Sequence, residues 1–258
     1  MSYLKITYDT ASIKISIDNP EKRNALNAEL MQELTEFFNN TKQDLKSFKY
    51  VLLEGEGKSF CAGADLNWMK EMVNYSFEEN VADSEKLFNL FSSIYTFDLP
   101  VVVKAHGHVF GGGLGLLAAA DLVVADDNTK FCFSEVKLGL APAVISSFVL
   151  SKCNPSHAQA FMLSGEVFGT SKAFHMGLIN LEYKKDNFKS LLENFEQSSQ
   201  EALIATKKLI QAQRSLKPEA QKQMTMESIS KLRVSPEAQS RMNSFLHQKI
   251  QSKKAKGL

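Results

Sequence analysis

The stretch Phe60-Cys61-Ala62-Gly63-Ala64-Asp65 and the triplet Gly111-Gly112-Gly113 are the most informative parts of this chain. Small side chains in both stretches let the backbone approach a ligand closely. Two backbone N–H groups that meet at one carbonyl oxygen form an oxyanion hole. The two stretches therefore predict an enzyme that stabilises negative charge on a substrate oxygen. Tight turns between packed elements are the alternative explanation of the same glycines.

The composition is that of an ordinary globular protein. The chain has 258 residues, 44% hydrophobic and 23% charged, which suffices for one buried core with an extension. Its formal charge of +1 favours neither a nucleic-acid nor a membrane partner. Three cysteines without CxxC spacing predict no disulfide framework and no zinc site. No apolar run is long enough to span a bilayer, and residues 1–9 resemble a strand rather than a signal peptide. We therefore expect a cytoplasmic protein.

Hydrophobic periodicity predicts a mixed α/β chain. Alternating residues at 3–8 and 13–18 predict a β-hairpin, and Asn27 is placed to cap a helix with Leu30 and Leu34 on its apolar face. Further strands are predicted at 50–53, 101–104, 122–125 and 130–134. Helices between these strands suggest stacked β-β-α units. We predict a core over residues 1–190 and a C-terminal helical region over 191–258.

Several familiar motifs are incomplete. The segment 55–59 ends like a phosphate loop, but Leu52 stands where that motif requires glycine. The segment 111–115 is not a dinucleotide fingerprint, because Leu116 occupies the last glycine position. A GxSxG elbow is absent from the sequence. The histidines of His106-Gly107-His108 lack further ligands at metal-like spacing, so a structural role is favoured and no metal site is predicted.

In order and spacing, four segments resemble the crotonase superfamily, the enoyl-CoA hydratases and isomerases. They are Asn19-Pro20 with Asn24-Ala25-Leu26-Asn27, Phe60 to Leu66, Val109 to Gly115, and Phe131 to Pro142. The resemblance implies a crotonase-type α/β spiral of stacked β-β-α units with a C-terminal helical trimerisation region. It also implies a homotrimer or a dimer of trimers, an acyl-CoA thioester as substrate, and no cofactor beyond the coenzyme A moiety of that substrate.

The resemblance also assigns site residues. The amides of Ala64 and Gly112 match the family's oxyanion-hole donors, and Glu135 matches the carboxylate that moves protons to and from substrate carbons. The residues expected to bind the coenzyme are Lys22, Arg23, Ala25, Ala62, Gly63, Asp65 and Leu66. Those expected in the substrate pocket are Trp68, Gly115 and Pro142, with a loop at 73–79. We place Glu135 at the end of the strand 130–134, where a merely solvated glutamate is the alternative.

Gly115 departs from the family pattern. Two-carboxylate hydratases carry a second glutamate there, and the two carboxylates together hold and activate water. Isomerases of the superfamily lack it, since one base suffices to move a proton between two carbons. The segments most similar to bacterial methylglutaconyl-CoA hydratases of leucine breakdown are Phe60 to Lys70, Leu140 to Ser146, and Arg233 to Glu237. We expect hydration of a 2-enoyl-CoA such as 3-methylglutaconyl-CoA. The alternatives are a Δ3,Δ2-enoyl-CoA isomerase and a non-catalytic acyl-CoA-binding homologue.

The C-terminal segment Lys249 to Lys256 contains four lysines and no acidic residue. A solvated end is the simpler interpretation, and attraction to a phosphate-rich ligand is the alternative. In the family a basic pair near this point often helps to bind the coenzyme. Here the pair is Gln248-Lys249, which weakens the expectation of a phosphate contact.

Overall fold

The structure is a computed structural model that describes residues 2–41, 45–213 and 218–255. The chain divides into two compact units, one ending at Glu196 and one beginning at Gln197. The predicted boundary at residue 190 falls inside helix α8 (Lys185–Gln197). The side chains of residues 248–258 lie outside the described part, so the predictions for Gln248-Lys249 and the lysine-rich segment stay predictions.

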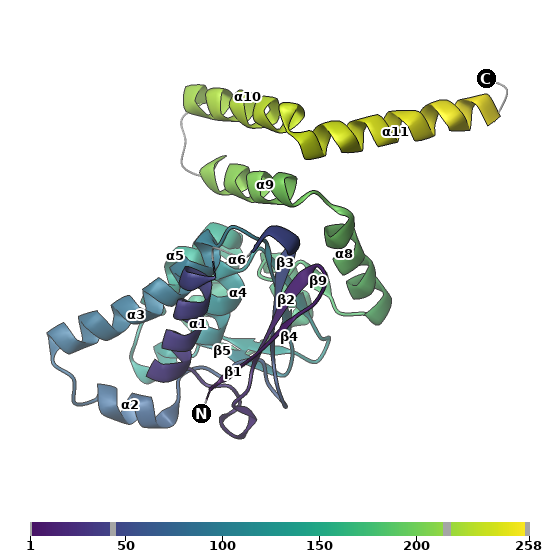
Figure 1. Ribbon diagram of the computed structural model, residues 1–258. Helices are drawn as coiled ribbons and strands as arrows, with labels where there is room; N and C mark the ends of the chain where they lie inside the picture. The colour runs from purple at the N-terminus through teal and green to yellow at the C-terminus, as the bar shows by residue number, and fades with distance from the viewer. Residues whose placement is uncertain (1, 42–44, 214–217, 256–258) are drawn as a thin grey trace. The chain divides into compact units, whose positions relative to one another are not determined.

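The first unit is built on a six-stranded sheet with the order β1-β2-β3-β4-β6-β9 (Figure 1). Its strands are β1 (Leu4–Tyr8), β2 (Ser12–Ile17), β3 (Tyr50–Gly55), β4 (Val101–Ala105), β6 (Leu122–Ala125) and β9 (Leu181–Glu182). β1 pairs antiparallel with β2, which confirms the hairpin, and the other neighbours are parallel. The parallel strands β2, β3, β4 and β6 are mostly buried, as expected for a sheet covered on both faces.

A second sheet of three strands has the order β5-β7-β8. Its strands are β5 (His108–Phe110), β7 (Lys130–Cys132) and β8 (Phe168–Gly169). β4 and β5 are followed by α4 (Gly112–Ala119), and β6 and β7 are followed by α5 (Ala143–Lys152). In each of these two segments, one strand joins the first sheet, the next joins the second sheet, and a helix follows. This is the predicted β-β-α repeat.

Helices and short 3-10 turns connect and cover the strands of this unit. The helices are α1 (Ala28–Asn40), α2 (Leu66–Met72), α3 (Phe77–Thr96), α6 (Pro155–Ser164) and α7 (Thr170–Met176), and the turns are η1 (Pro20–Lys22), η2 (Leu45–Ser47) and η3 (Glu135–Leu138). The predicted cap is confirmed, because Asn27 Oδ1 accepts the N–H of Leu30 at 2.8 Å. The segment 73–79 is not wholly a loop as predicted. A capping box of Ser76 and Glu79 starts α3 at Phe77.

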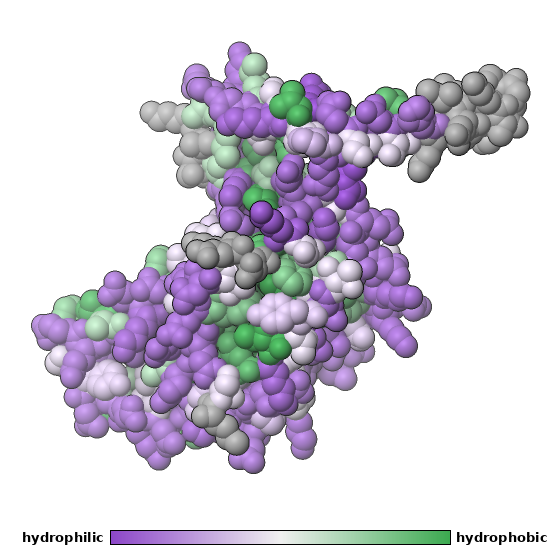
Figure 2. All heavy atoms as spheres, in the orientation of Figure 1, coloured by the Kyte–Doolittle hydropathy of each residue, from purple (hydrophilic) through white to green (hydrophobic). Residues whose placement is uncertain are grey.

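Apolar side chains hold the helices of this unit against the sheet and against one another. α8 places Phe188, Leu192 and Phe195 against Tyr50 and Leu52 of the sheet. α1 packs against α3, and α4 packs against α5. On the face shown in Figure 2 the surface of this unit is mostly hydrophilic, with hydrophobic side chains between the polar ones. Apolar side chains are exposed at Phe77 and Val81 in the first turns of α3 and at Val73 before it.

The second unit is helical, as predicted. It contains α9 (Gln200–Gln213), α10 (Pro218–Val234) and α11 (Pro236–Ala255). Pro236 begins α11, where its missing N–H costs no helical hydrogen bond. None of the helices in the described ranges is long and apolar enough to cross a membrane. A role of this unit in trimerisation stays a prediction.

Candidate active site

The segment 60–65 is held in place by two bridges to neighbouring backbone. Cys61 pairs with Val109 of β5, and Ala64 pairs with Leu26. In the second bridge, the N–H of Leu26 donates to the Gly63 oxygen at 2.7 Å and the N–H of Asp65 donates to the Leu26 oxygen at 2.8 Å. Because the residues on either side of Ala64 make these bonds, its own N–H points away from Leu26. Among the described residues this N–H has no backbone acceptor.

The turn from β5 into α4 presents a second N–H group. Gly111 has φ 48° and ψ −119°, a conformation that favours glycine, and its N–H donates to the Cys132 oxygen at 3.0 Å. Gly112 is the first residue of α4, so its N–H has no acceptor inside the helix. The positive end of the helix dipole lies at the same point and favours a developing negative charge.

The two segments meet beside Glu135. A Cβ atom on Gly111 would lie 3.9 Å from Gly63 Cα and 3.7 Å from Glu135 Oε1. A Cβ atom on Gly113 would lie only 2.6 Å from the Cys61 oxygen, so a side chain there would push the segments apart. Gly63 and Gly111 directly precede the two predicted donor residues. The structure thus brings the predicted donor segments and the predicted base to one place.

Glu135 does not end a strand, which corrects the sequence prediction. The last paired residue of β7 is Cys132, opposite Phe110, because β5 ends there and no partner continues the ladder. Glu135 instead begins η3. Its Oε2 atom is buried and has no hydrogen-bond partner among the described residues. Burial raises the pKa of Glu135, since the charged form loses water. A buried carboxyl with a raised pKa is suited to proton transfer.

A surface pocket of about 460 Å³ is lined in part by Ala64. Its lining residues are Glu21, Lys22, Arg23, Ala25, Ala62, Ala64, Asp65, Leu66 and Asn67. The set includes every predicted coenzyme-binding residue except Gly63. Glu21 and Asn67 were not predicted, although each directly neighbours a predicted residue. The pocket brings two cations, Lys22 and Arg23, close to the segment that carries Ala64.

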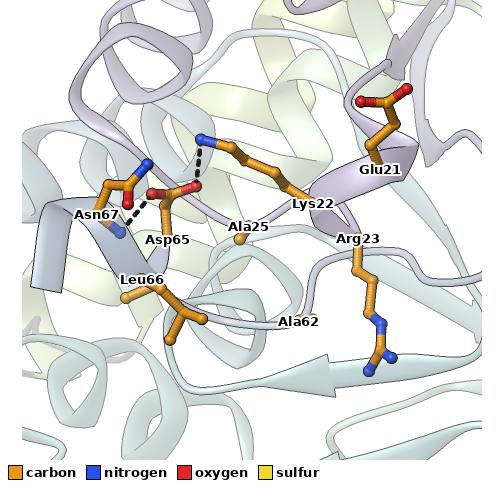
Figure 3. Close-up of a pocket in the computed structure, with 9 residues that line it drawn as sticks. Glu21, Lys22, Arg23, Ala25, Ala62, Asp65, Leu66 and Asn67 are labelled. Carbon is orange, nitrogen blue, oxygen red and sulfur yellow. Dashed lines mark hydrogen bonds and ion pairs between the residues drawn. The ribbon is translucent and has the colours of Figure 1, made fainter.

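Lys22 and Asp65 form an ion pair across this pocket. Lys22 Nζ lies 2.8 Å from Asp65 Oδ2, whereas Arg23 points away from the pair (Figure 3). Asp65 is buried and caps α2, because its Oδ1 accepts the N–H groups of Asn67 and Trp68. The hydrogen bond from Lys22 holds the pKa of Asp65 below its usual value. Asp65 therefore fixes the position of Lys22 and the start of α2.

The predicted substrate-pocket residues lie on three different helices or their caps. Trp68 is buried on α2, and its Nε1 donates to Oδ1 of Asp83 on α3 at 3.2 Å. Gly115 is buried in α4, and a Cβ atom there would lie 2.3 Å from Phe91 Cζ. Pro142 is the N-cap of α5, close in the chain to η3. Asp83 and Phe91 were missed by sequence reasoning, because nothing local indicates which residues of α3 face α2 and α4.

The side chains of His106 and His108 both make contacts that fit the structural role favoured from the sequence. His106 Nε2 lies 3.1 Å from the Gly57 oxygen, and His108 Nδ1 lies 3.4 Å from Ser59 Oγ. Both histidines therefore tie the second-sheet region to the loop before Phe60. Within the described ranges, no group of three side chains is arranged to hold a metal ion.

Comparison with known proteins identifies the family. The model of the enoyl-CoA hydratase/isomerase family matches residues 8–254. The chain is 30% identical over 213 residues to the carnitinyl-CoA dehydratase of Escherichia coli K12, covering 80% of this chain and 79% of that protein. It is 33% identical over 176 residues to the enoyl-CoA hydratase AKT6-1 of Alternaria alternata, covering 68% of this chain and 57% of that protein.

A crystal structure of an enoyl-CoA hydratase from Shewanella pealeana has a TM-score of 0.90 to this chain at 31% identity. The match covers 96% of this chain and 94% of that one. The chain belongs to the enoyl-CoA hydratase/isomerase family, and the predicted crotonase-type α/β fold is confirmed. It is an enzyme of the hydratase/isomerase kind.

Proposed function

We propose that the protein adds water to the α,β double bond of a 2-enoyl-CoA, or removes it in the reverse reaction, with Glu135 as the single acid/base. The buried, unpaired Oε2 of Glu135 carries this proposal, in a side chain whose Oε1 would lie 3.7 Å from a Cβ atom on Gly111. The relatives named enoyl-CoA hydratase and carnitinyl-CoA dehydratase support it, because both names describe gain or loss of water in a coenzyme A thioester.

In the proposed reaction the thioester oxygen accepts the N–H groups of Ala64 and Gly112. Glu135 takes a proton from water while the water oxygen bonds to C3, and the electron pair of the double bond moves to form an enolate. Glu135 then returns this proton to C2, which regenerates the carboxylate. One donor of an oxyanion hole is typically worth about 3 kcal/mol of transition-state stabilisation. The raised pKa of Glu135 makes its carboxylate a better base for taking the proton from water.

The coenzyme portion of the substrate is proposed to lie in the pocket of Lys22 and Arg23. Phosphate groups make strong charge-assisted hydrogen bonds with cationic side chains, and these two side chains line the pocket. The Lys22 ammonium also bonds Asp65, so the pocket presents it at a fixed position. No cofactor beyond the coenzyme A moiety enters the proposed reaction.

Phe91 favours a second candidate function, Δ3,Δ2-enoyl-CoA isomerisation. Its ring fills the space beside Gly115 where a second glutamate side chain would begin, so no second carboxylate can bind water there. Isomerisation needs no water. Glu135 would take a proton from C2 of a 3-enoyl-CoA and return it to C4 as the double bond moves to C2–C3.

Product analysis on three thioesters separates these candidates. We expect hydration of crotonyl-CoA or 3-methylglutaconyl-CoA to outrun isomerisation of 3-hexenoyl-CoA. The opposite order would replace the hydratase proposal by the isomerase. Binding of all three thioesters without any product would instead support a non-catalytic homologue.

Glu135→Gln tests the acid/base assignment. Glutamine keeps the size of the side chain but cannot accept a proton, so turnover should fall at least about a hundredfold while thioester affinity stays similar. Glu166→Gln is the matched control, because Glu166 is an exposed carboxylate that pairs with Lys172 at 2.8 Å. A Glu135→Gln protein with most of its turnover would show that another group is the base.

A further inference from the structure

The N-terminal half of α3 buries a carboxylate. From Phe77 to Lys86, Asp83 is the one buried residue, with a relative exposure of 9%, and the other residues are exposed. An amphipathic helix ordinarily buries apolar side chains on its inner face. A buried charge is costly unless partners compensate it. The neutral N–H of Trp68, at 3.2 Å from Oδ1, supplies one such partner.

Asp83 lies on the same face of α3 as Leu87 and Phe91, the two residues that contact glycines of α4. Asp83, Leu87 and Phe91 are spaced four residues apart, so they share one face of α3. Leu87 Cδ1 lies 4.0 Å from the position of a Cβ atom on Gly112, and Phe91 lies against Gly115. Each helical turn advances about 5.4 Å. Asp83 therefore lies about one turn beyond Leu87, past the N-terminal end of α4.

This position is on the acyl side of the proposed oxyanion hole. Asn67 lines the coenzyme pocket, whereas the next residue, Trp68, is buried and contacts Asp83. Neither Trp68 nor Asp83 is among the residues that line the coenzyme pocket. The acyl group of a thioester extends from the carbonyl carbon on the side opposite the sulfur. With the sulfur toward the coenzyme pocket, the acyl group extends toward α3 and Asp83.

We propose that Asp83, oriented by Trp68, selects enoyl-CoA thioesters whose acyl group carries a hydrogen-bond donor or a positive charge at C4. Such a group gives the buried carboxylate a further partner of complementary charge. An acyl group that ends in a carboxylate would instead bring two like charges together away from water, which disfavours binding. The inference rests on the proposed function in one respect, the binding of the thioester carbonyl at Ala64 and Gly112.

Asp83 is thus a proposed specificity-determining residue, and it argues against 3-methylglutaconyl-CoA as a preferred substrate. Burial raises the pKa of Asp83. The hydrogen bond from Trp68 and the exposed Lys86 act in the opposite direction and favour its charged form. The charged form is the one that distinguishes a cationic from an anionic acyl group.

Four trans-2-butenoyl-CoA thioesters, with hydrogen, hydroxyl, trimethylammonium or carboxylate on C4, test the proposal. We expect protein that retains Asp83 to bind the carboxylate-bearing thioester at least about tenfold more weakly than the hydroxyl- or trimethylammonium-bearing ones. Asp83→Asn keeps an oxygen that accepts the Trp68 N–H but removes the charge. It should reduce this discrimination about tenfold while affinity for the unsubstituted thioester changes less than about twofold. Glu85→Gln removes an equal charge from an exposed position of α3 and is the matched control.

The affinities are measured by titration of the Glu135→Gln protein, so that no thioester is consumed. Wild-type turnover is measured in parallel, so that failure of the hydratase proposal can be told apart from failure of the proposed role of Asp83. Discrimination without any hydration would overturn the hydratase proposal and leave the role of Asp83 standing. Equal affinities for the four thioesters, or an equal loss for all of them in Asp83→Asn, would show that Asp83 only joins α3 to α2. Either of these results would overturn the inference.

Discussion

Gly115→Ala tests whether Phe91 fills the space where a second catalytic carboxylate would begin. The added methyl carbon would lie 2.3 Å from Phe91 Cζ, 2.6 Å from Cε2 and 2.8 Å from Cε1. These distances are well below an ordinary carbon–carbon contact of about 3.5–4.0 Å. The ring has little room to move, because Phe91 is fully buried and its centroid lies 5.6 Å from that of Phe148 in an edge-to-face contact.

The expected loss of stability follows from two opposing effects. Overpacking a core costs about 1–3 kcal/mol, and three ring carbons at such short distances place this site near the upper end. Replacing a glycine inside a helix by alanine returns about 1 kcal/mol. We therefore expect Gly115→Ala to lower the free energy of unfolding by about 2 kcal/mol. Gly169→Ala is the control, because a Cβ atom there has nothing within 4 Å. Its effect should stay within about 0.5 kcal/mol.

Urea unfolding of a double-mutant cycle provides the measurement. Phe91→Leu shortens the side chain that faces Gly115, so Gly115→Ala should cost at least about 1 kcal/mol less in that background than in the wild type. Additive losses from the two substitutions would refute the reasoning, since they would show that the ring and the added methyl group do not compete for one space.

Two further predictions concern the proposed donor and base. Gly112→Pro removes the N–H at the first position of α4, where proline is tolerated, and should lower turnover by about two to three orders of magnitude. Gly112→Ala keeps the N–H and places a Cβ atom at the same position, 2.7 Å from Leu26 Cδ1, so equal losses in both variants would exclude the amide as a donor. Because Glu135 must be ionised to accept a proton and burial raises its pKa, kcat/KM should rise with pH through a midpoint above 4.5. A pH profile whose acid midpoint lies at or below that value would contradict the assignment.

Features with local causes could be predicted from the sequence. The hairpin follows from alternation within β1 and β2, and the start of α1 follows from the side chain of Asn27. The close approach of the two donor segments follows from glycines at 63 and 111, since larger residues are disfavoured at their positive φ values of 104° and 48°. These causes lie within a few residues of their effects.

Features that depend on tertiary packing could not be predicted. Glu135 was expected at a strand end, but the length of β7 is set by its partner β5. Phe91 and Gly115 are far apart in the chain, and only the packing of α3 on α4 brings the ring against the glycine. Asp83 resembles the exposed acids around it in sequence, and only its contact with Trp68 distinguishes it.

The loss of the second carboxylate is coupled to α3 rather than confined to Gly115. A glutamate at 115 would bring its Cβ atom against the Phe91 ring, as Gly115→Ala does, and its longer side chain would add to that overlap. Two-carboxylate chemistry would require changes on both helices. Four and eight residues before Phe91, the same face of α3 carries Leu87 beside Gly112 and then Asp83. In the proposed site, one face of α3 therefore excludes a second catalytic acid at one end and presents the Asp83 carboxylate at the other. Substitutions on that face should change substrate preference and reaction type without altering Ala64, Gly112 or Glu135.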